Sequence, residues 1–378
     1  RPTGNFGSPT KERFCIMKKH VGGGPLMCAE FWVGWFDHWG NGGHMKGNLE
    51  QSAADLDEML STGHVNVYMF IGGTNFGFMN GSNYYDELTP DVTSYDYDAV
   101  LTEAGDLTEK YEVYKGIIGK HAAIPEVKLS TEIVKRAYGS VEVREKVGLF
   151  QALEDISAPV CSAYTQSMER LGQSYGYILY TSRIVNERRL EKIRLHKAND
   201  RANIFLGGKR LLNLYDRELL QEWEIQADAE PGDQLCILME NMGRVNFGPR
   251  MEEQRKGIDG CVQINGHMHH EWRQYCLPLD NLDRLDYTRG YEEGLPAFYR
   301  FELTVEKRGD TFLELPGWGK GCVFVNGFNI GRYWEIGPQK RLYIPAPLLK
   351  QGKNEIIVFE TEGKSSGIIS FCDEPDIG

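Results

Sequence analysis

A strand, a helix and a second strand follow one another near the start of this chain, and this order constrains the fold most. The apolar run 26–29 and the longer run 65–71 (VNVYMFI) each indicate a buried strand. Between them, apolar residues recur on one face of a helix that Gly63 is placed to end. The residues of this face are Leu49, Ala53, Leu56, Met59 and Leu60. Strand, crossover helix and strand form the βαβ unit of a parallel sheet, such as that of a (β/α)8 barrel.

A carboxylate stands at the end of the first of these strands, and tryptophans follow it at once. Glu30 comes directly after the apolar run and precedes Trp32, Trp35 and Trp39. In a parallel barrel, catalytic groups lie at the C-terminal ends of strands. Aromatic faces stack on sugar rings, and a carboxylate beside them can attack an anomeric carbon. The alternative is a glutamate buried in a tryptophan-rich core, but an unpaired charge is costly there, so the segment favours a functional site.

Three blocks of the chain, in this order, resemble the β-galactosidases of glycoside hydrolase family 35. They are residues 29–40 (AEFWVGWFDHWG), 65–76 (VNVYMFIGGTNF) and 93–99 (TSYDYDA). The resemblance continues through residues 103–107 (EAGDL) and, more loosely, through the C-terminal half. It implies a retaining exo-β-galactosidase that removes terminal β-linked galactose from oligosaccharides, with Glu30 as the nucleophile. No cofactor and no metal are expected.

The resemblance also implies residues for the sugar pocket. The family's tyrosines in the second and third blocks line the galactose pocket, and they correspond to Tyr68 and Tyr97 in this chain. The aromatic residue two positions after the nucleophile is often tyrosine in the family. Here it is Trp32, which we also assign to substrate binding.

A retaining glycosidase needs a second carboxyl group, roughly 5–5.5 Å from the nucleophile, as acid/base. In the family this glutamate lies in an Asn-Glu-Tyr-Gly-like block well before the nucleophile, and residues 1–29 contain no such block. The chain contains two other Asn-Glu pairs, Asn186-Glu187 and Asn354-Glu355. Both fall in β-rich sequence after the barrel portion, so neither is assigned as the acid/base. We therefore expect the C-terminal portion of a longer enzyme, with the last two barrel strands, and an isolated chain that is inactive without the N-terminal barrel half. The alternative is a carbohydrate-binding or structural portion with no turnover of its own.

From about residue 141 onward, helical periodicity gives way to short alternating apolar runs, which indicate β-sandwiches. We predict an α/β part followed by all-β parts: the last part of a (β/α)8 TIM barrel, then two jelly-roll-like β-sandwich domains. The ranges are 1–124 for the barrel part, 125–140 for a linker, 141–275 for the first sandwich and 276–378 for a galactose-binding-like jelly roll.

Two groups of side chains in the β-rich half have competing interpretations. Trp318, Tyr333 and Trp334 either form a sugar platform or pack the last sandwich against the barrel or a neighbouring sheet, and we favour packing because aromatics dominate cores as readily as ligand faces. The segment 267–270 (HMHH) has metal-ligand residue types. It follows Asn265-Gly266, a hairpin signal, and is therefore expected to lie exposed at a strand start.

Composition limits the classes of partner. The chain has 378 residues and a net charge of −12, which argues against nucleic acid and anionic membrane surfaces. No apolar run approaches the ~20 residues that span a membrane. Eight cysteines without a Cys-x-x-Cys pair indicate reduced thiols and predict a cytoplasmic location. The expected partners are a β-galactoside oligosaccharide and the N-terminal barrel half, with a homodimer as a candidate assembly.

Overall fold

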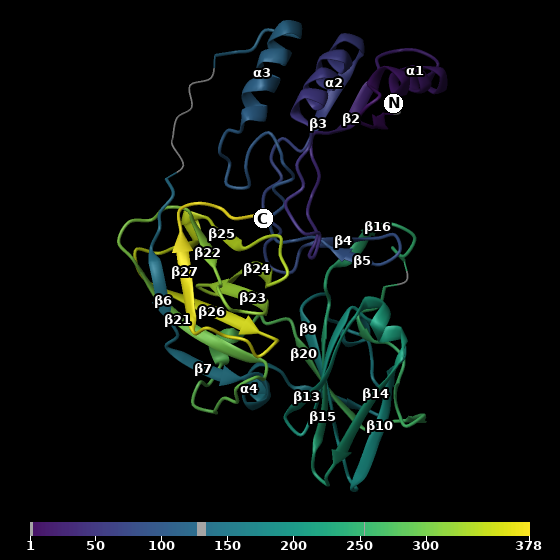
Figure 1. The fold of residues 1–378 in the computed structure, drawn as a ribbon, viewed down its shortest axis with the longest axis vertical. Helices are drawn as coiled ribbons and strands as arrows, with labels where there is room; N and C mark the ends of the chain where they lie inside the picture. The colour runs from purple at the N-terminus through teal and green to yellow at the C-terminus, as the bar shows by residue number, and fades with distance from the viewer. Residues whose placement is uncertain (1–2, 127–133, 253) are drawn as a thin grey trace.

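A computed structural model of the chain describes residues 3–126, 134–252 and 254–378. The N-terminal part is an α/β layer, and two β-sandwiches lie side by side beyond it (Figure 1). The layer contains a parallel sheet whose strands neighbour one another in this order: β1 (Gly4–Asn5), β2 (Met27–Trp32) and β3 (His64–Tyr68). Three helices share a hydrophobic core with this sheet: α1 (Thr10–Val21), α2 (Leu49–Thr62) and α3 (Glu109–His121).

The predicted βαβ unit is present as β2, α2 and β3, with the two strands parallel. Asn48 caps the start of α2 by accepting a hydrogen bond from the Gln51 backbone N–H at 2.9 Å. The helix ends before Gly63, as predicted, but Gly63 is extended (φ −164°) and not left-handed. A Cβ atom there would lie 2.7 Å from the Leu26 carbonyl oxygen, so the close approach of the chain requires glycine. We expected two strands in this layer, and the short β1 makes a third because it pairs with β2.

The first sandwich packs a six-stranded sheet, in the order β13-β12-β15-β9-β20-β8, on a four-stranded sheet, in the order β14-β10-β18-β19. Side chains from both sheets form one core. The six strands of the larger sheet are β8 (Pro159–Ser162), β9 (Tyr177–Arg183), β12 (Arg201–Leu206), β13 (Lys209–Tyr215), β15 (Gln234–Glu240) and β20 (Trp272–Leu277). The smaller sheet holds β10 (Arg188–Leu195), β14 (Glu222–Ala229), β18 (Val262–Ile264) and β19 (His267–Met268).

The second sandwich packs the sheet β24-β23-β26-β21-β7 on the sheet β25-β22-β27-β6 around its own core. Its first sheet holds β7 (Glu145–Gly148), β21 (Ala297–Val305), β23 (Lys320–Val325), β24 (Phe328–Trp334) and β26 (Gly352–Glu360). Its second sheet holds β6 (Gly139–Glu142), β22 (Thr311–Glu314), β25 (Arg341–Ile344) and β27 (Ile368–Cys372). Strands β6 and β7 thus pair with C-terminal strands, although the predicted ranges place them in the linker and the first sandwich.

Smaller elements connect these parts. The loop after β3 forms β4 (Gly81–Tyr84) and β5 (Leu88–Pro90), and β4 pairs in parallel with β16 (Arg244–Phe247) of the first sandwich. Helix α4 (Leu149–Ile156) contributes to a core between the two sandwiches. The remaining short elements are β11 (Ala198–Asn199), β17 (Gly257–Ile258) and 3-10 turns at Glu169–Leu171, Asp216–Leu220, Leu282–Arg284 and Ala346–Leu348. Residues 127–133 of the predicted linker lie outside the described residues.

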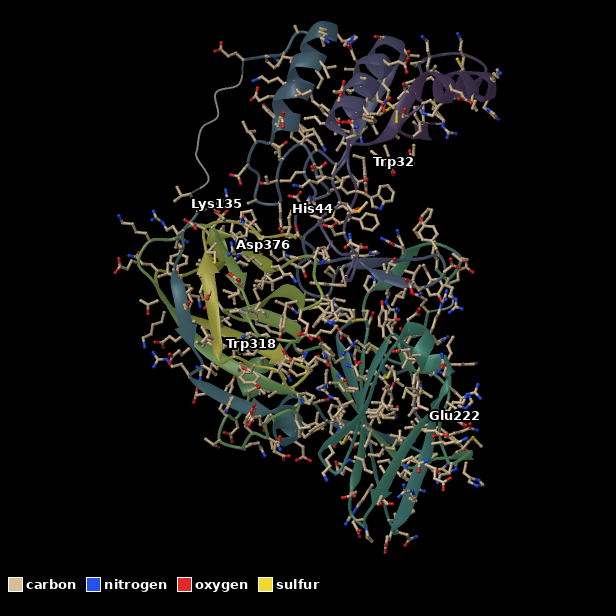
Figure 2. All side chains as sticks on the ribbon, viewed as in Figure 1. Trp32, His44, Lys135, Glu222, Trp318 and Asp376 are labelled. Atoms are coloured by element: carbon tan, nitrogen blue, oxygen red, sulfur yellow. The ribbon has the colours of Figure 1, made fainter. Side chains whose placement is uncertain are left out.

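The predicted packing role is found for two of the C-terminal aromatics, which lie in the core between the two sheets of the second sandwich. Trp318 is 2% exposed and Tyr333 is 6% exposed. Both belong to the core of the second sandwich, and Figure 2 labels Trp318 there. Their polar atoms have partners: the Trp318 indole N–H donates to the Ile368 carbonyl at 2.8 Å, and the Tyr333 hydroxyl donates to Glu360 at 2.6 Å. Two buried rings with satisfied polar atoms offer no sugar platform.

The histidine-containing segment forms the predicted hairpin. β18 and β19 are joined through Asn265 and Gly266, which both have positive φ angles (53° and 76°), and both β19 residues are exposed. Across the described ranges, no group of His, Cys, Asp and Glu has a metal-binding arrangement. Nor does any helix in those ranges have the length and apolar character required to cross a membrane.

Candidate active site

Glu30 lies where β2 slips out of register with both of its neighbours. The consecutive residues Gly4 and Asn5 of β1 pair with Cys28 and Glu30, so β2 has one extra residue between these two pairs. Against β3, it skips one residue between Cys28 and Phe31. Cys28 and Phe31 are consequently both buried in the core, whereas Glu30 is partly exposed. A bulge of this kind re-aims a side chain near the end of a strand, which is a common arrangement at active sites.

Two tryptophans present aromatic surface beside Glu30. The Trp32 indole N–H donates a hydrogen bond to Oε2 of Glu30 at 3.2 Å. Trp32 is 38% exposed and Trp35 is 40% exposed, and their rings meet nearly at right angles with centroids 6.1 Å apart. Trp32 lies on the side of the α/β layer that faces the sandwiches (Figure 2). Exposed rings beside a carboxylate suit contact with the apolar face of a sugar.

The predicted tyrosines lie together. Tyr68 ends β3, and its ring meets that of Tyr97 edge to face, with centroids 5.5 Å apart. Tyr95 stacks on Tyr97 at 5.5 Å, and Trp35 lies 6.2 Å from Tyr97. The structure thus brings Tyr68 and Tyr97 into one aromatic cluster, and adds Tyr95 to it.

Burial favours the neutral forms of the Tyr95 and Tyr97 phenols. Burial raises the pKa of Tyr97 well above its usual value, and the neighbouring Tyr68 phenol and the negative charge of Glu30 raise it further. Burial is also the main cause that raises the pKa of Tyr95, and a hydrogen bond with Tyr68 raises that pKa further. At neutral pH these phenols therefore donate and accept hydrogen bonds without carrying charge.

Some residues of the site were not singled out from the sequence. Trp35 was named among the tryptophans after Glu30 but was not assigned to the sugar pocket. Tyr95 lies in the third block, two positions before Tyr97, and this position could have indicated it. Asp37, His44 and Asp96 form a row of ionisable side chains next to the tyrosines. His44 has no such signal, because its partner Asp96 is far away in the sequence.

The arrangement can support nucleophilic chemistry on a sugar. It combines a partly exposed carboxylate on a strand bulge, an indole N–H that donates to this carboxylate, neutral phenols that can bind hydroxyl groups, and exposed aromatic surface. None of these features requires a metal ion.

Three families of known sequences match this chain. Residues 2–121 match the family described as "Glycosyl hydrolases family 35". Residues 165–279 match "Beta-galactosidase, first all-beta domain", and residues 296–354 match "Beta-galactosidase, galactose-binding domain".

Curated relatives agree with these matches. "Beta-galactosidase 17" of Arabidopsis thaliana is 36% identical over 92% of this chain and 56% of its own length. "Beta-galactosidase-1-like protein 2" of Homo sapiens is 38% identical over 94% of this chain and 56% of its own length. "Beta-galactosidase" of Xanthomonas manihotis is 35% identical over 85% of this chain and 53% of its own length. The chain therefore spans little more than half the length of the curated relatives that it matches.

Proposed function

Because this chain belongs to glycosyl hydrolases family 35, we propose that the protein is a retaining exo-β-galactosidase with Glu30 as its nucleophile. The observation that carries the proposal is the position of Glu30, on a strand bulge of a parallel sheet and hydrogen-bonded by Trp32. We further propose that β1, β2 and β3 with their helices are the last part of a (β/α)8 barrel, and that both sandwiches are jelly rolls.

In the proposed reaction, a Glu30 carboxylate oxygen attacks the anomeric carbon of a terminal β-galactose. A covalent galactosyl ester forms while the bond from the anomeric carbon to the departing oxygen breaks. Water then hydrolyses the ester, and the sugar leaves with its original β configuration. Tyr68 and Tyr97 bind hydroxyl groups of galactose, and Trp32 orients the carboxylate and contacts the ring.

The departing oxygen needs a proton from a second carboxyl group. We propose that this acid/base belongs to the N-terminal barrel half of the complete enzyme, which agrees with relatives of much greater length. The 378-residue chain alone is then expected to leave lactose intact. A nitrophenyl β-galactoside needs little protonation of its leaving group, so turnover of that compound alone would leave the assignment standing. Robust turnover of lactose by the chain would refute it.

The function is tested on the full-length enzyme with a panel of galactosyl and glucosyl disaccharides. We expect release of galactose alone, and Glu30→Gln should lose nearly all turnover while its unfolding curve stays normal. Glu50→Gln, an exposed carboxylate at the start of α2, is the matched control and should retain full activity. A 2-fluoro-galactoside should label Glu30, and labelling of another residue would exclude Glu30 as nucleophile. Sugar binding without turnover by the full-length protein would favour the binding-module alternative.

A second variant tests the role of Trp32. Trp32→Phe keeps an aromatic ring but removes the N–H that donates to Glu30. Loss of one hydrogen bond worth about 1 kcal/mol predicts a roughly fivefold lower kcat. An unchanged kcat would show that this hydrogen bond has no role in turnover.

A further inference from the structure

The loop of residues 95–98, which carries Tyr95 and Tyr97, has an uncommon backbone conformation. Tyr97 and Asp98 have φ angles of +68° and +49°, in the left-handed region that residues other than glycine rarely adopt. Such a conformation persists only where the surroundings hold it in place. The contacts around this loop therefore decide where the Tyr97 phenol stands relative to Glu30.

Two glycines support the loop. A Cβ atom on Gly72 would lie 1.5 Å from the Tyr95 carbonyl oxygen, and a Cβ atom on Gly34 would lie 1.9 Å from that of Tyr97. The loop backbone thus rests directly on the chain that follows β3 and β2, with no side chain between. At the same place the Tyr95 backbone N–H donates to the Gly73 carbonyl at 2.9 Å.

Helix α3 restrains the second end of the loop. Lys110 donates from Nζ to Asp98 Oδ2 and to the Val33 carbonyl, each at 2.8 Å. The Lys110 side chain is only 5% exposed, so water competes weakly for these bonds. The Asp98 end is therefore attached to both a helix and the residue after β2.

His44 restrains the first end. Its Nδ1 lies 2.7 Å from Asp37 Oδ2, and its Nε2 lies 3.6 Å from Asp96 Oδ1. The side chains of His44, Asp37 and Asp96 are 4%, 5% and 13% exposed. We call these three residues the His44 bridge. It links the segment after β2 to the residue that stands between the two tyrosines.

Both ends of the His44 bridge are anchored to backbone. Asp37 accepts from the Met45 N–H at 2.8 Å, and Asp96 Oδ2 accepts from the Glu103 N–H at 2.9 Å. The direct contact between His44 and Asp37 leaves no room for a cation between those atoms. The bridge is therefore a hydrogen-bonded and ionic contact, not a metal site.

The charge of His44 strengthens this contact. Burial by itself disfavours the imidazolium, but the hydrogen bond to Asp37 and the charges of Asp37, Asp96 and Asp98 outweigh it and raise the pKa of His44. These three carboxylates come from the segments after β2 and β3, and Lys110 pairs with Asp98. Deprotonation of His44 would remove the cation that Asp96 faces.

We propose that His44 is a positioning residue, and that its protonated form holds the loop 95–98 so that Tyr97 keeps its packing against Tyr68 and Trp35. The proposal rests on the proposed function, since it concerns the same site. His44 itself touches no substrate and acts through Asp96. Activity then depends on the protonation of a side chain outside the reacting groups.

The kinetic test compares the full-length wild-type enzyme with His44→Gln over pH 5.5–9. Glutamine can keep a hydrogen bond but carries no charge. At pH 5.5 the kcat/KM of the variant should be about tenfold lower than that of the wild type. The ratio of wild-type to variant kcat/KM should approach one at alkaline pH, where wild-type His44 is neutral. Asp96→Asn should show the same convergence, and the double variant should be no worse than either single variant. His121→Gln is the matched control, because His121 pairs with Asp57 at 2.5 Å on the helical surface, away from the tyrosines.

A ratio of one at every pH would overturn the proposal. So would a tenfold ratio that is constant with pH, because that pattern indicates a structural role without titration. A second readout needs no activity: NMR of histidine- and tyrosine-labelled protein should show His44 titrating above 6.5 and the Tyr97 ring signals shifting in step. If the full-length enzyme hydrolyses no β-galactoside, the proposed function fails. The NMR titration still tests whether the protonation of His44 positions the loop 95–98. Tyr97 signals unaffected by His44→Gln would refute it.

Discussion

Lys320 of the second sandwich donates to Glu240 of the first sandwich, with its Nζ 2.6 Å from Oε1, and the two side chains are 1% and 3% exposed. The Nε atom of Arg332 lies 3.3 Å from the same Oε1 of Glu240. Arg332 also donates a hydrogen bond to the side-chain oxygen of Asn80, in the loop that follows β3. Burial disfavours the charge of Glu240, but Lys320, Arg332 and Arg201 outweigh it and hold the pKa of Glu240 below its usual value. One buried carboxylate thus joins all three parts of the molecule.

Glu240→Gln should destabilise the protein by about 3–5 kcal/mol, because it leaves the buried charges of Lys320 and Arg332 without their counter-ion. Urea unfolding of the purified protein measures this loss. The matched control is Glu302→Gln, whose partner Lys353 is 75% exposed, and it should leave the midpoint of unfolding unchanged. Equal effects of the two substitutions would show that the buried pair adds nothing to stability.

Gly331→Ala tests the contact between the α/β part and the second sandwich. Thr93 donates from its hydroxyl to the Arg332 carbonyl at 2.7 Å, and a Cβ atom on Gly331 would lie 2.3 Å from the Thr93 side chain. Gly331 also has a φ of +123°. Steric overlap and backbone strain together should cost about 3 kcal/mol or more in unfolding free energy.

Gly327→Ala separates strain from overlap. Gly327 also has a positive φ, +85°, but a Cβ atom there meets nothing within 4 Å. The substitution Gly327→Ala should therefore lower the unfolding free energy by about 1 kcal/mol, the cost of the left-handed backbone conformation alone. Similar decreases in unfolding free energy for the two variants would contradict the prediction. They would mean that Thr93 moves aside without a cost in free energy and does not hold the two parts together.

Glu103 should make the protein less stable as pH rises toward neutrality. Burial raises the pKa of Glu103 to about 7, although the Thr74 hydroxyl that donates to it at 2.6 Å acts in the opposite direction. In the unfolded chain the ordinary value is 4.5, so folding favours the protonated acid and the penalty grows between these two pH values. Above pH 7 the penalty is on the order of 3 kcal/mol.

Glu103→Gln removes this titration while its amide oxygen still accepts from Thr74. The variant should match the wild type at pH 4.5 and be the more stable protein at pH 8, as measured by melting temperature. Asp91 and Glu360, whose burial also raises their pKa values to about 7, remain in both proteins, so the difference isolates Glu103. Parallel stability curves would contradict the prediction.

The tryptophans after Glu30 show the limit of sequence neighbourhood. Trp32 and Trp35 present their rings beside the carboxylate, as the sugar-binding interpretation requires. Trp39 is 7% exposed and packs 6.4 Å from Trp334 of the second sandwich. The next residue, Gly40, donates its N–H to the Gly337 carbonyl at 2.8 Å. Trp39 therefore packs against the second sandwich, although Phe36 still stacks on Tyr95 and Asp37 still pairs with His44.

The sequence by itself determined the βαβ order, the placement of Glu30 on the first of the two predicted strands and the β-rich character of the later chain, although β2 continues to Trp32 and Glu30 lies at a bulge within it. These features follow from local spacing of apolar residues and from turn chemistry, which neighbouring residues carry. Only the tertiary structure decided that β6 and β7 join the second sandwich, that His44 meets Asp96 and that Glu240 meets Lys320. Each of these contacts joins residues far apart in the chain, 80 positions in the last case. Strand pairing and buried ion pairs depend on which surfaces pack together, and local propensity carries no information about that choice.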